Sequence, residues 1–136
     1  MASIFSKIIV GEIPSYKIAE NDKFYAFLDV FPLVHGHTLV VPKHEVDKIY
    51  ELNQDELSEL LQFAQPIARA IEKAFPCKRC GMSVIGLEVP HAHLHLVPIN
   101  TADDLNFTRE KMKLSQEDLL EAQTKILNQL QILSNE

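Results

Sequence analysis

Hydrophobic residues recur at helical spacing over a long stretch in the middle of the chain. Asn53 can cap a helix that starts near Gln54, and Glu56 completes a capping box with it. Apolar side chains then fall on one face, about every 3.6 residues, as far as the residue before Pro76. Pro66 lies inside this stretch and is expected to kink it. The pattern predicts a long, amphipathic central helix.

A second apolar stripe follows a capping sequence near the C-terminus. Ser115 and Asp118 repeat the capping arrangement, and Leu114 and Leu119 flank it as a hydrophobic staple. A C-terminal helix is therefore predicted to begin after Ser115. The apolar run at residues 4–9 predicts a further, short helix near the N-terminus.

Five short apolar runs, separated by turn residues, have the character of strands. They are residues 16–19, 24–28, 38–41, 82–85 and 93–97. Short connections join the first three runs, which favours an antiparallel meander, and the central helix leads to the last two. We therefore expect an α+β fold: an antiparallel five-stranded sheet with a long central helix and a C-terminal helix.

Length and composition narrow the class of protein. The 136 residues suit one domain, and 46% hydrophobic with 24% charged residues is typical of a globular protein. No run approaches the roughly 18 apolar residues of a membrane span, and the start lacks the order of a signal peptide. We therefore expect a cytoplasmic protein without a membrane partner.

Charge and cysteine content argue against a nucleic-acid-binding protein and against a disulfide-rich one. The net charge is −6, and the basic residues are scattered apart from a short cluster of Arg109, Lys111 and Lys113. An acidic protein repels a polyphosphate backbone, so nucleic acid is not an expected partner. Cys77 and Cys80 are too few for a disulfide scaffold and are interpreted as reduced thiols.

All six histidines lie in two short segments. Three surround the predicted third strand and three occupy alternate positions at the predicted fifth: His35, His37 and His44, then His91, His93 and His95. Alternate side chains of a strand share one face, so the second set is expected to line up together, with Ala92, Leu94 and Leu96 opposite. We interpret His35 and His44 as structural or solvated residues.

Two kinds of chemistry explain such a row. The first and third residues lie about 13 Å apart in a strand, so one metal ion cannot easily bind both, and His37, Asp29 or Glu88 would have to complete the ligands. The other explanation is metal-free attack on a phosphate, in which one neutral imidazole is the nucleophile and a neighbouring ring supplies a proton. The sequence favours the second explanation and leaves the first open.

Residues 91–97 read H-φ-H-φ-H-φ-φ, where φ is apolar, and this stretch resembles the signature of the histidine triad (HIT) superfamily of nucleotide hydrolases and transferases. Three further segments are similar to family blocks in the same order: residues 4–14, 27–32 and 36–43. The resemblance implies a single HIT-like domain over residues 1–136, with a core at 4–98 and a C-terminal loop and helix at 100–136.

The resemblance implies a role for each polar residue. His93 is similar to the family nucleophile, which attacks the α-phosphate of a nucleotide, and His95 to the histidine that contacts the phosphate and helps to protonate the leaving group. His91 matches the residue whose main-chain carbonyl orients the nucleophile, and His37 matches a supporting histidine on the neighbouring strand. Asp29 falls where the family's acidic residue holds the ribose hydroxyls.

The resemblance also implies a nucleotide pocket and one departure from the family pattern. Many relatives carry a Gln amide that binds the α-phosphate where this chain has Leu87. Either Ser83 or a main-chain amide is expected to take that role, or turnover on the family's usual substrates is expected to be weak. Five apolar residues fall where the family encloses the base: Phe5, Ile8, Phe27, Leu28 and Val30. Core packing is the alternative for each of them, and it explains Phe27 and Val30 equally well.

The expected function is that of a hydrolase or transferase acting at the α-phosphate of purine nucleotide conjugates, either phosphoramidates or dinucleoside polyphosphates. It releases a nucleoside monophosphate through a covalent nucleotidyl-histidine and needs no metal or other cofactor. A homodimer is expected by analogy with compact relatives. Two alternatives stay open: a nucleotide-binding regulatory protein with little turnover, and a metal-dependent hydrolase.

Overall fold

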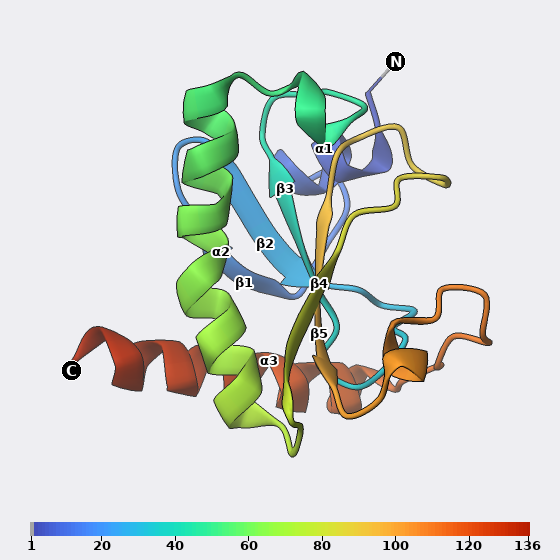
Figure 1. Cartoon of the computed structure of the whole chain (residues 1–136), viewed down its shortest axis with the longest axis vertical. Coiled ribbons are helices and arrows are strands. Elements are labelled where there is room, and N and C mark those ends of the chain that lie inside the picture. Colours follow the sequence, from blue (N-terminus) through green and yellow to red (C-terminus); the bar gives the residue numbers. More distant parts are fainter. Residues whose placement is uncertain (1) are drawn as a thin grey trace.

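The computed structural model describes residues 2–136, which form a five-stranded antiparallel sheet with three α-helices (Figure 1). The strand order is β1-β2-β3-β5-β4, and α2 connects β3 to β4. The predicted α+β class and the antiparallel meander of the first three strands are therefore confirmed. The elements are α1 (Ile4–Ile9), β1 (Lys17–Glu20), β2 (Phe24–Leu28), β3 (Thr38–Pro42), η1 (Ile49–Glu51), α2 (Gln54–Ala74), β4 (Arg79–Ser83), β5 (Leu94–Ile99), η2 (Ala102–Leu105) and α3 (Gln116–Ser134).

Side-chain caps begin the helices where the sequence predicts them. The Asn53 side chain accepts a hydrogen bond from the Glu56 amide at 2.8 Å, and the Ser115 hydroxyl accepts one from the Asp118 amide at 3.1 Å. These caps satisfy amides that have no partner within the helix. The helix α2 is continuous through Pro66 for 21 residues.

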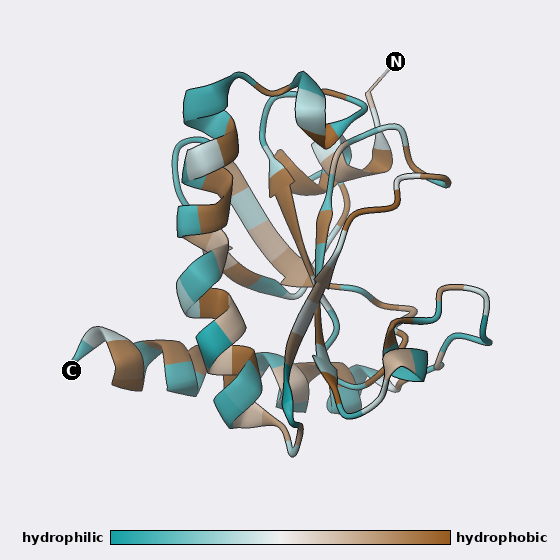
Figure 2. Cartoon of the chain, in the orientation of Figure 1, coloured by the Kyte–Doolittle hydropathy of each residue, from teal (hydrophilic) through white to brown (hydrophobic). Residues whose placement is uncertain are grey.

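The sheet is covered on both faces, and β2 and β3 are buried along their whole length. One face packs against α2 and α3 and forms the larger core, and Figure 2 shows the apolar side of α2 turned toward the sheet. The other face carries a smaller cluster in which Phe5 and Ile8 of α1 contact Phe27 and Leu39. Within residues 2–136, no helix combines the length and apolar character that crossing a membrane requires.

The fourth strand covers residues 79–83 rather than the predicted 82–85. Its pairing with β5 ends where Ser83 lies opposite His95, and the chain then turns away at Gly86, which has a φ of +75°. The apolar character of residues 84 and 85 suggested a strand, but their side chains are exposed beyond the end of the ladder.

The fifth strand covers residues 94–99 rather than 93–97, so His91 and His93 lie before it. The amide of Ala92 donates to the carbonyl of Val46 at 2.7 Å instead of joining the ladder with β4. The prediction that all three histidines stand on one regular strand is wrong in this respect. The alternation still holds, because Leu94 and Leu96 belong to the larger core while His95 lies opposite Leu39 on the other face.

Candidate active site

Four buried histidines form a connected row on the face of the sheet that carries α1. His37, His91, His93 and His95 are each less than a tenth exposed. The His93 and His95 rings stand edge to face with centroids 4.8 Å apart, and the His37 and His95 rings are 5.1 Å apart. Phe5 packs edge-on against His93 at 5.0 Å. The structure therefore brings the predicted histidines together.

Main-chain groups determine which nitrogen of His37 and His95 carries a proton. The Leu33 amide donates to Nδ1 of His37 at 3.0 Å, so this nitrogen must accept. The neutral His37 ring then carries its proton on Nε2, which donates to Nδ1 of His95 at 2.9 Å. His95 consequently presents an Nε2–H group on its remaining side.

The other two histidines are fixed in the same way. Nδ1 of His93 lies 2.7 Å from the carbonyl oxygen of His91, which can only accept, so Nδ1 carries the proton and Nε2 of neutral His93 keeps its lone pair. Nε2 of His91 donates to the Pro42 carbonyl at 2.7 Å, and its Nδ1 accepts from the Ser3 hydroxyl at 2.7 Å. The His93 ring, with a lone pair on Nε2, thus stands next to the His95 ring, which carries an Nε2–H group.

Burial keeps three rings of this row uncharged. Loss of hydration lowers the pKa of His37 and of His95 to about 3, with further lowering by the charges of neighbouring groups. It also lowers the pKa of His91. At pH 7 these rings are neutral, as the hydrogen-bond assignments require. Such a pair of rings can attack an electrophile through His93 while His95 donates a hydrogen bond to it.

A cavity of about 390 Å³ opens beside His93 and His95. All six residues expected to hold the nucleoside line it: Phe5, Ile8, Phe27, Leu28, Asp29 and Val30. Ser83 shares the sheet face of His95 through their pairing, but it is not part of the cavity wall. We refer to this space as the nucleoside cavity.

Asp29 is an acidic residue in the wall of the nucleoside cavity. Its Oδ1 accepts from the Phe31 amide at 2.9 Å, and its Oδ2 lies 3.9 Å from Nε2 of His37. Burial raises its pKa, while the Phe31 amide and nearby positive charge lower it. The carboxylate keeps acceptor capacity toward the cavity, which suits a pair of hydroxyl donors.

The residues Asp29, His37 and His95 each offer a ligand atom within 4.8 Å of one another, as a metal site requires. A metal ion needs a lone pair on each ligand atom. The Leu33 amide occupies Nδ1 of His37 and leaves a proton on Nε2, the nitrogen that faces the other two residues. These three residues therefore do not fit a metal in the arrangement shown.

Two residues at the site, Lys111 and Phe107, were not predicted from the sequence, and Glu88 was considered only as a metal ligand. Lys111 and Glu88 line the nucleoside cavity, and Phe107 stands edge-on to His95 with centroids 4.6 Å apart. Lys111 and Phe107 come from the segment between η2 and α3, which matched no family block. The cluster of basic residues near position 110 is the one sequence signal that could have pointed to this segment.

His35 and His44 lie away from the row. His35 contacts the Asp118 carbonyl at 3.1 Å, and His44 pairs with Glu56 at 3.4 Å.

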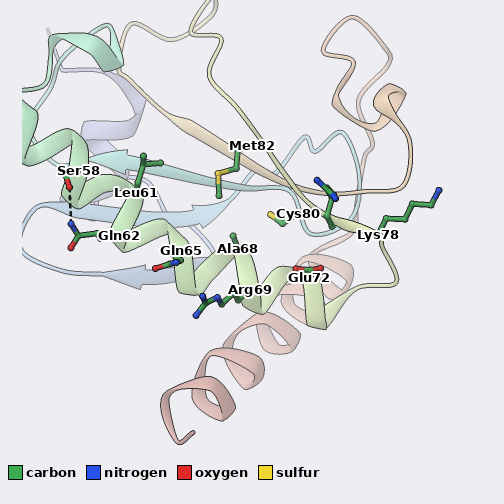
Figure 3. Close-up of a pocket in the computed structure, with 11 residues that line it drawn as sticks. Ser58, Leu61, Gln62, Gln65, Ala68, Arg69, Glu72, Lys78, Cys80 and Met82 are labelled. Carbon is green, nitrogen blue, oxygen red and sulfur yellow. Dashed lines mark hydrogen bonds between the residues drawn. The ribbon is translucent and has the colours of Figure 1, made fainter.

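A wider, shallower groove of about 690 Å³ runs between α2 and β4 (Figure 3). Its lining in the described chain is a mixture of polar residues with Leu61 and Met82 and contains no histidine.

Comparison with known proteins extends these observations. A model of the HIT domain matches residues 10–102. The chain is 36% identical over 98 residues to adenosine 5'-monophosphoramidase from Saccharomyces cerevisiae, an alignment that covers 71% of this chain and 62% of the yeast protein. It is 41% identical over 103 residues to protein hit from Bacillus subtilis, covering 70% of this chain and 69% of that protein. A zinc-bound histidine triad family protein from Mycobacterium smegmatis superposes with a TM-score of 0.83 and 27% identity, covering 100% of this chain and 99% of that chain.

Proposed function

This chain belongs to the HIT family, and we propose on that basis that it is a hydrolase or nucleotidyl transferase acting at the α-phosphate of purine nucleotide conjugates. Relatives named as adenosine 5'-monophosphoramidases support nucleotide hydrolysis as the class of reaction. One observation carries the proposal: the lone pair on Nε2 of His93 beside the N–H group on Nε2 of His95.

In the first step, Nε2 of His93 attacks the α-phosphorus and forms an N–P bond. The bond from phosphorus to the leaving atom breaks, and the leaving atom takes the electron pair. The modified His93 ring becomes a cation, which its Nδ1–H contact with the His91 carbonyl stabilises at 2.7 Å. The His95 Nε2–H group donates a hydrogen bond to the oxygens that gain charge.

The His37–His95 contact assigns the source of the leaving group's proton. A second proton on His95 would set two N–H groups against each other across 2.9 Å, because Nε2 of His37 already carries one. We therefore assign His95 as a hydrogen-bond donor, and the leaving group departs with a proton that the substrate already carries. This assignment replaces the expectation that His95 protonates the leaving group.

In the second step, water attacks the phosphorus of the nucleotidyl-histidine. The N–P bond breaks, His93 recovers its neutral ring with the proton still on Nδ1, and the proton lost by water passes to solvent. The nucleoside monophosphate is then released. Throughout both steps Asp29 would hold the ribose hydroxyls, and the apolar walls of the nucleoside cavity would enclose the base.

A homodimer joined through β4 is also part of the proposal. The strand β4 lies at the edge of the sheet, and apolar side chains of Leu61, Met82 and Ile85 near it are about half exposed. An exposed strand edge can pair with the same edge of a second copy across a two-fold axis. Sedimentation analysis should show a dimer that Met82→Asp dissociates, whereas Ile132→Asp, a change at an equally exposed residue of α3, should leave it intact.

The proposed activity is tested by incubating the protein with adenosine 5'-monophosphoramidate and measuring released AMP. Protein quenched during turnover is then analysed by mass spectrometry for an added nucleotide. We expect AMP release and an adduct with the native protein and with His44→Ala, whose ring is exposed, and neither with His93→Ala. An adduct on another residue would show that the nucleophile is assigned wrongly.

The same experiment separates the other two functions. A regulatory nucleotide-binding protein is favoured by Leu87, whose side chain is 90% exposed and offers no amide to a phosphate. It would bind AMP without releasing it from any conjugate. A metal-dependent hydrolase would lose its activity with a chelator and regain it with one added metal.

A further inference from the structure

A segment from the C-terminal part of the chain crosses beside the histidine row. We call residues 106–112 the strap. Phe107 at its start packs edge-on to His95, and the amide of Met112 at its end donates to the Pro32 carbonyl at 2.8 Å. Between these two points the strap forms part of the wall of the site.

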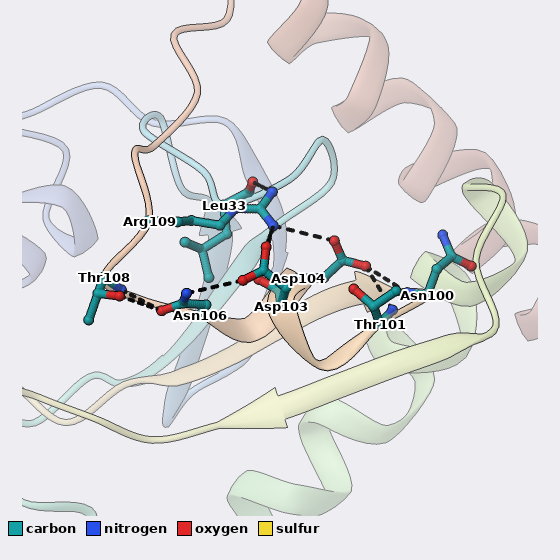
Figure 4. Close-up of polar contacts among 8 residues, drawn as sticks. All are labelled: Leu33, Asn100, Thr101, Asp103, Asp104, Asn106, Thr108 and Arg109. Carbon is teal, nitrogen blue, oxygen red and sulfur yellow. Dashed lines mark hydrogen bonds and ion pairs between the residues drawn. The ribbon is translucent and has the colours of Figure 1, made fainter.

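Arg109 fixes the middle of the strap, as Figure 4 shows. Its guanidinium donates to the Leu33 carbonyl at 2.8 Å and to the main-chain carbonyl of Asp103 at 2.9 Å. It also pairs with the carboxylate of Asp104 at 3.5 Å. Since the Leu33 amide orients His37, Arg109 ties the strap directly to the loop that sets the histidine row.

The strap places Lys111 between two cavities. The nucleoside cavity is one of them, and a second cavity of about 170 Å³ adjoins it, with Phe107, Thr108 and the loop before Glu88 in its wall. Glu88, Lys111 and the rings of His93 and His95 line both. A phosphate attacked by His93 therefore lies where the cavities meet, with the nucleoside on one side and the leaving group on the other.

The second cavity has less than half the volume of the nucleoside cavity, 170 Å³ against 390 Å³. A cavity of this size suits a group of the size of phosphate better than a second nucleoside. Of the residues in the described range 2–136 that line either cavity, Lys111 alone is a lysine or arginine. Its ammonium group lies 3.7 Å from the Glu88 carboxylate, which is 83% exposed and can move aside for a ligand anion.

We propose that Lys111 binds the leaving group in the second cavity and selects small anionic ones, so that preferred substrates are anhydrides of a nucleoside monophosphate with a small acid such as phosphate. The inference rests on the proposed function, because it names the substrate class for the same site. It also explains which group of the second cavity supplies positive charge to a departing phosphate.

The chemistry of the leaving group gives Lys111 its effect. As His93 forms the N–P bond, the bridging oxygen takes the electron pair of the breaking P–O bond. A departing phosphate keeps the proton on its other oxygen and leaves as hydrogen phosphate, with its added negative charge next to the ammonium group. Ammonia departing from a phosphoramidate is uncharged and gains little from that cation.

The test compares two substrates in two matched variants. We expect Lys111→Met to lower kcat/KM for adenosine 5'-diphosphate by about tenfold or more, and to lower it for adenosine 5'-monophosphoramidate by less than about threefold. Lys113→Met removes the same charge from an exposed position outside both cavities and should change neither value. Equal losses on both substrates would place Lys111 at the α-phosphate and overturn the inference, as would no loss on either.

A binding measurement separates this inference from the proposed function. In a His93→Ala background, which consumes no nucleotide, titration calorimetry should show tighter binding of adenosine 5'-diphosphate than of AMP. Adding Lys111→Met should remove that difference while Lys113→Met preserves it. If the native protein turns over neither substrate, the proposed function fails, and the titrations still decide the role of Lys111: an unchanged affinity ratio refutes it.

Discussion

Ser3→Ala tests whether the N-terminal helix holds the histidine row in place. The Ser3 hydroxyl accepts from the Ser6 amide at 3.0 Å as the cap of α1, and it donates to Nδ1 of the fully buried His91 at 2.7 Å. Losing a cap costs about 1 kcal/mol. Leaving a buried ring nitrogen without its partner adds about 2 kcal/mol. The substitution should therefore lower the free energy of unfolding by about 3 kcal/mol.

Ser115→Ala is the matched control, because Ser115 caps α3 without touching a histidine. Its expected cost is about 1 kcal/mol. Urea unfolding gives both free energies, and thermal unfolding should show a midpoint lowered by roughly 10 °C for Ser3→Ala and roughly 3 °C for Ser115→Ala. Equal losses in the two variants would refute the argument that the Ser3–His91 contact is a separate source of stability.

The remaining predictions concern charge, ribose binding and backbone strain. The low folded-state pKa of His37 and of His95, about 3, means that the unfolded chain binds more protons below pH 6.5. The contribution of the two rings to the free energy of unfolding is therefore complete above pH 6.5. It falls as the pH drops toward 3, by up to about 1.4 kcal/mol per pH unit for each ring. Denaturant titrations at several pH values should show that the free energy of unfolding falls less steeply with pH in His95→Gln. Asp29→Asn should weaken binding of AMP about tenfold but that of 2',3'-dideoxy-AMP much less, as calorimetry can show. Gly36→Ala should cost about 3 kcal/mol, because φ is +100° and the new Cβ would lie 2.6 Å from an aromatic ring, whereas Gly86→Ala meets open space and should cost about 1 kcal/mol.

Features that depend on neighbouring residues could be predicted from the sequence. The caps at Asn53 and Ser115 begin their helices as expected, because a cap and its amide partner lie three residues apart. The alternation of histidines with apolar residues also survives, because one side of the segment must face the larger core. The ends of β4 and β5 were misplaced, because a partner strand rather than local propensity decides where pairing stops.

Features that depend on long-range contacts could not be predicted in this way. Lys111 reaches the site because Arg109 contacts the Leu33 carbonyl across 76 positions of sequence. No periodicity or capping pattern encodes such a contact. The positions of the ring protons could not be predicted from the sequence either. The Pro42 carbonyl, which fixes the proton of His91 on Nε2, lies 49 residues away from it in the sequence.

The hydrogen bonds from the main chain to the histidines have a consequence for the site as a whole. Side-chain partners of the rings could change from donor to acceptor with pH. The main-chain partners cannot, because the Leu33 amide can only donate and the carbonyls of Pro42 and His91 can only accept. Each main-chain group therefore fixes the ring nitrogen that faces it as a donor or an acceptor, and burial keeps His37, His91 and His95 neutral. These neutral rings leave the added negative charge of a departing phosphate uncompensated, and the strap places Lys111 in the wall of the second cavity, next to that charge. The same substitution of Lys111 should consequently weaken phosphate binding without altering the proton positions, which nitrogen-15 shifts of the four rings can report.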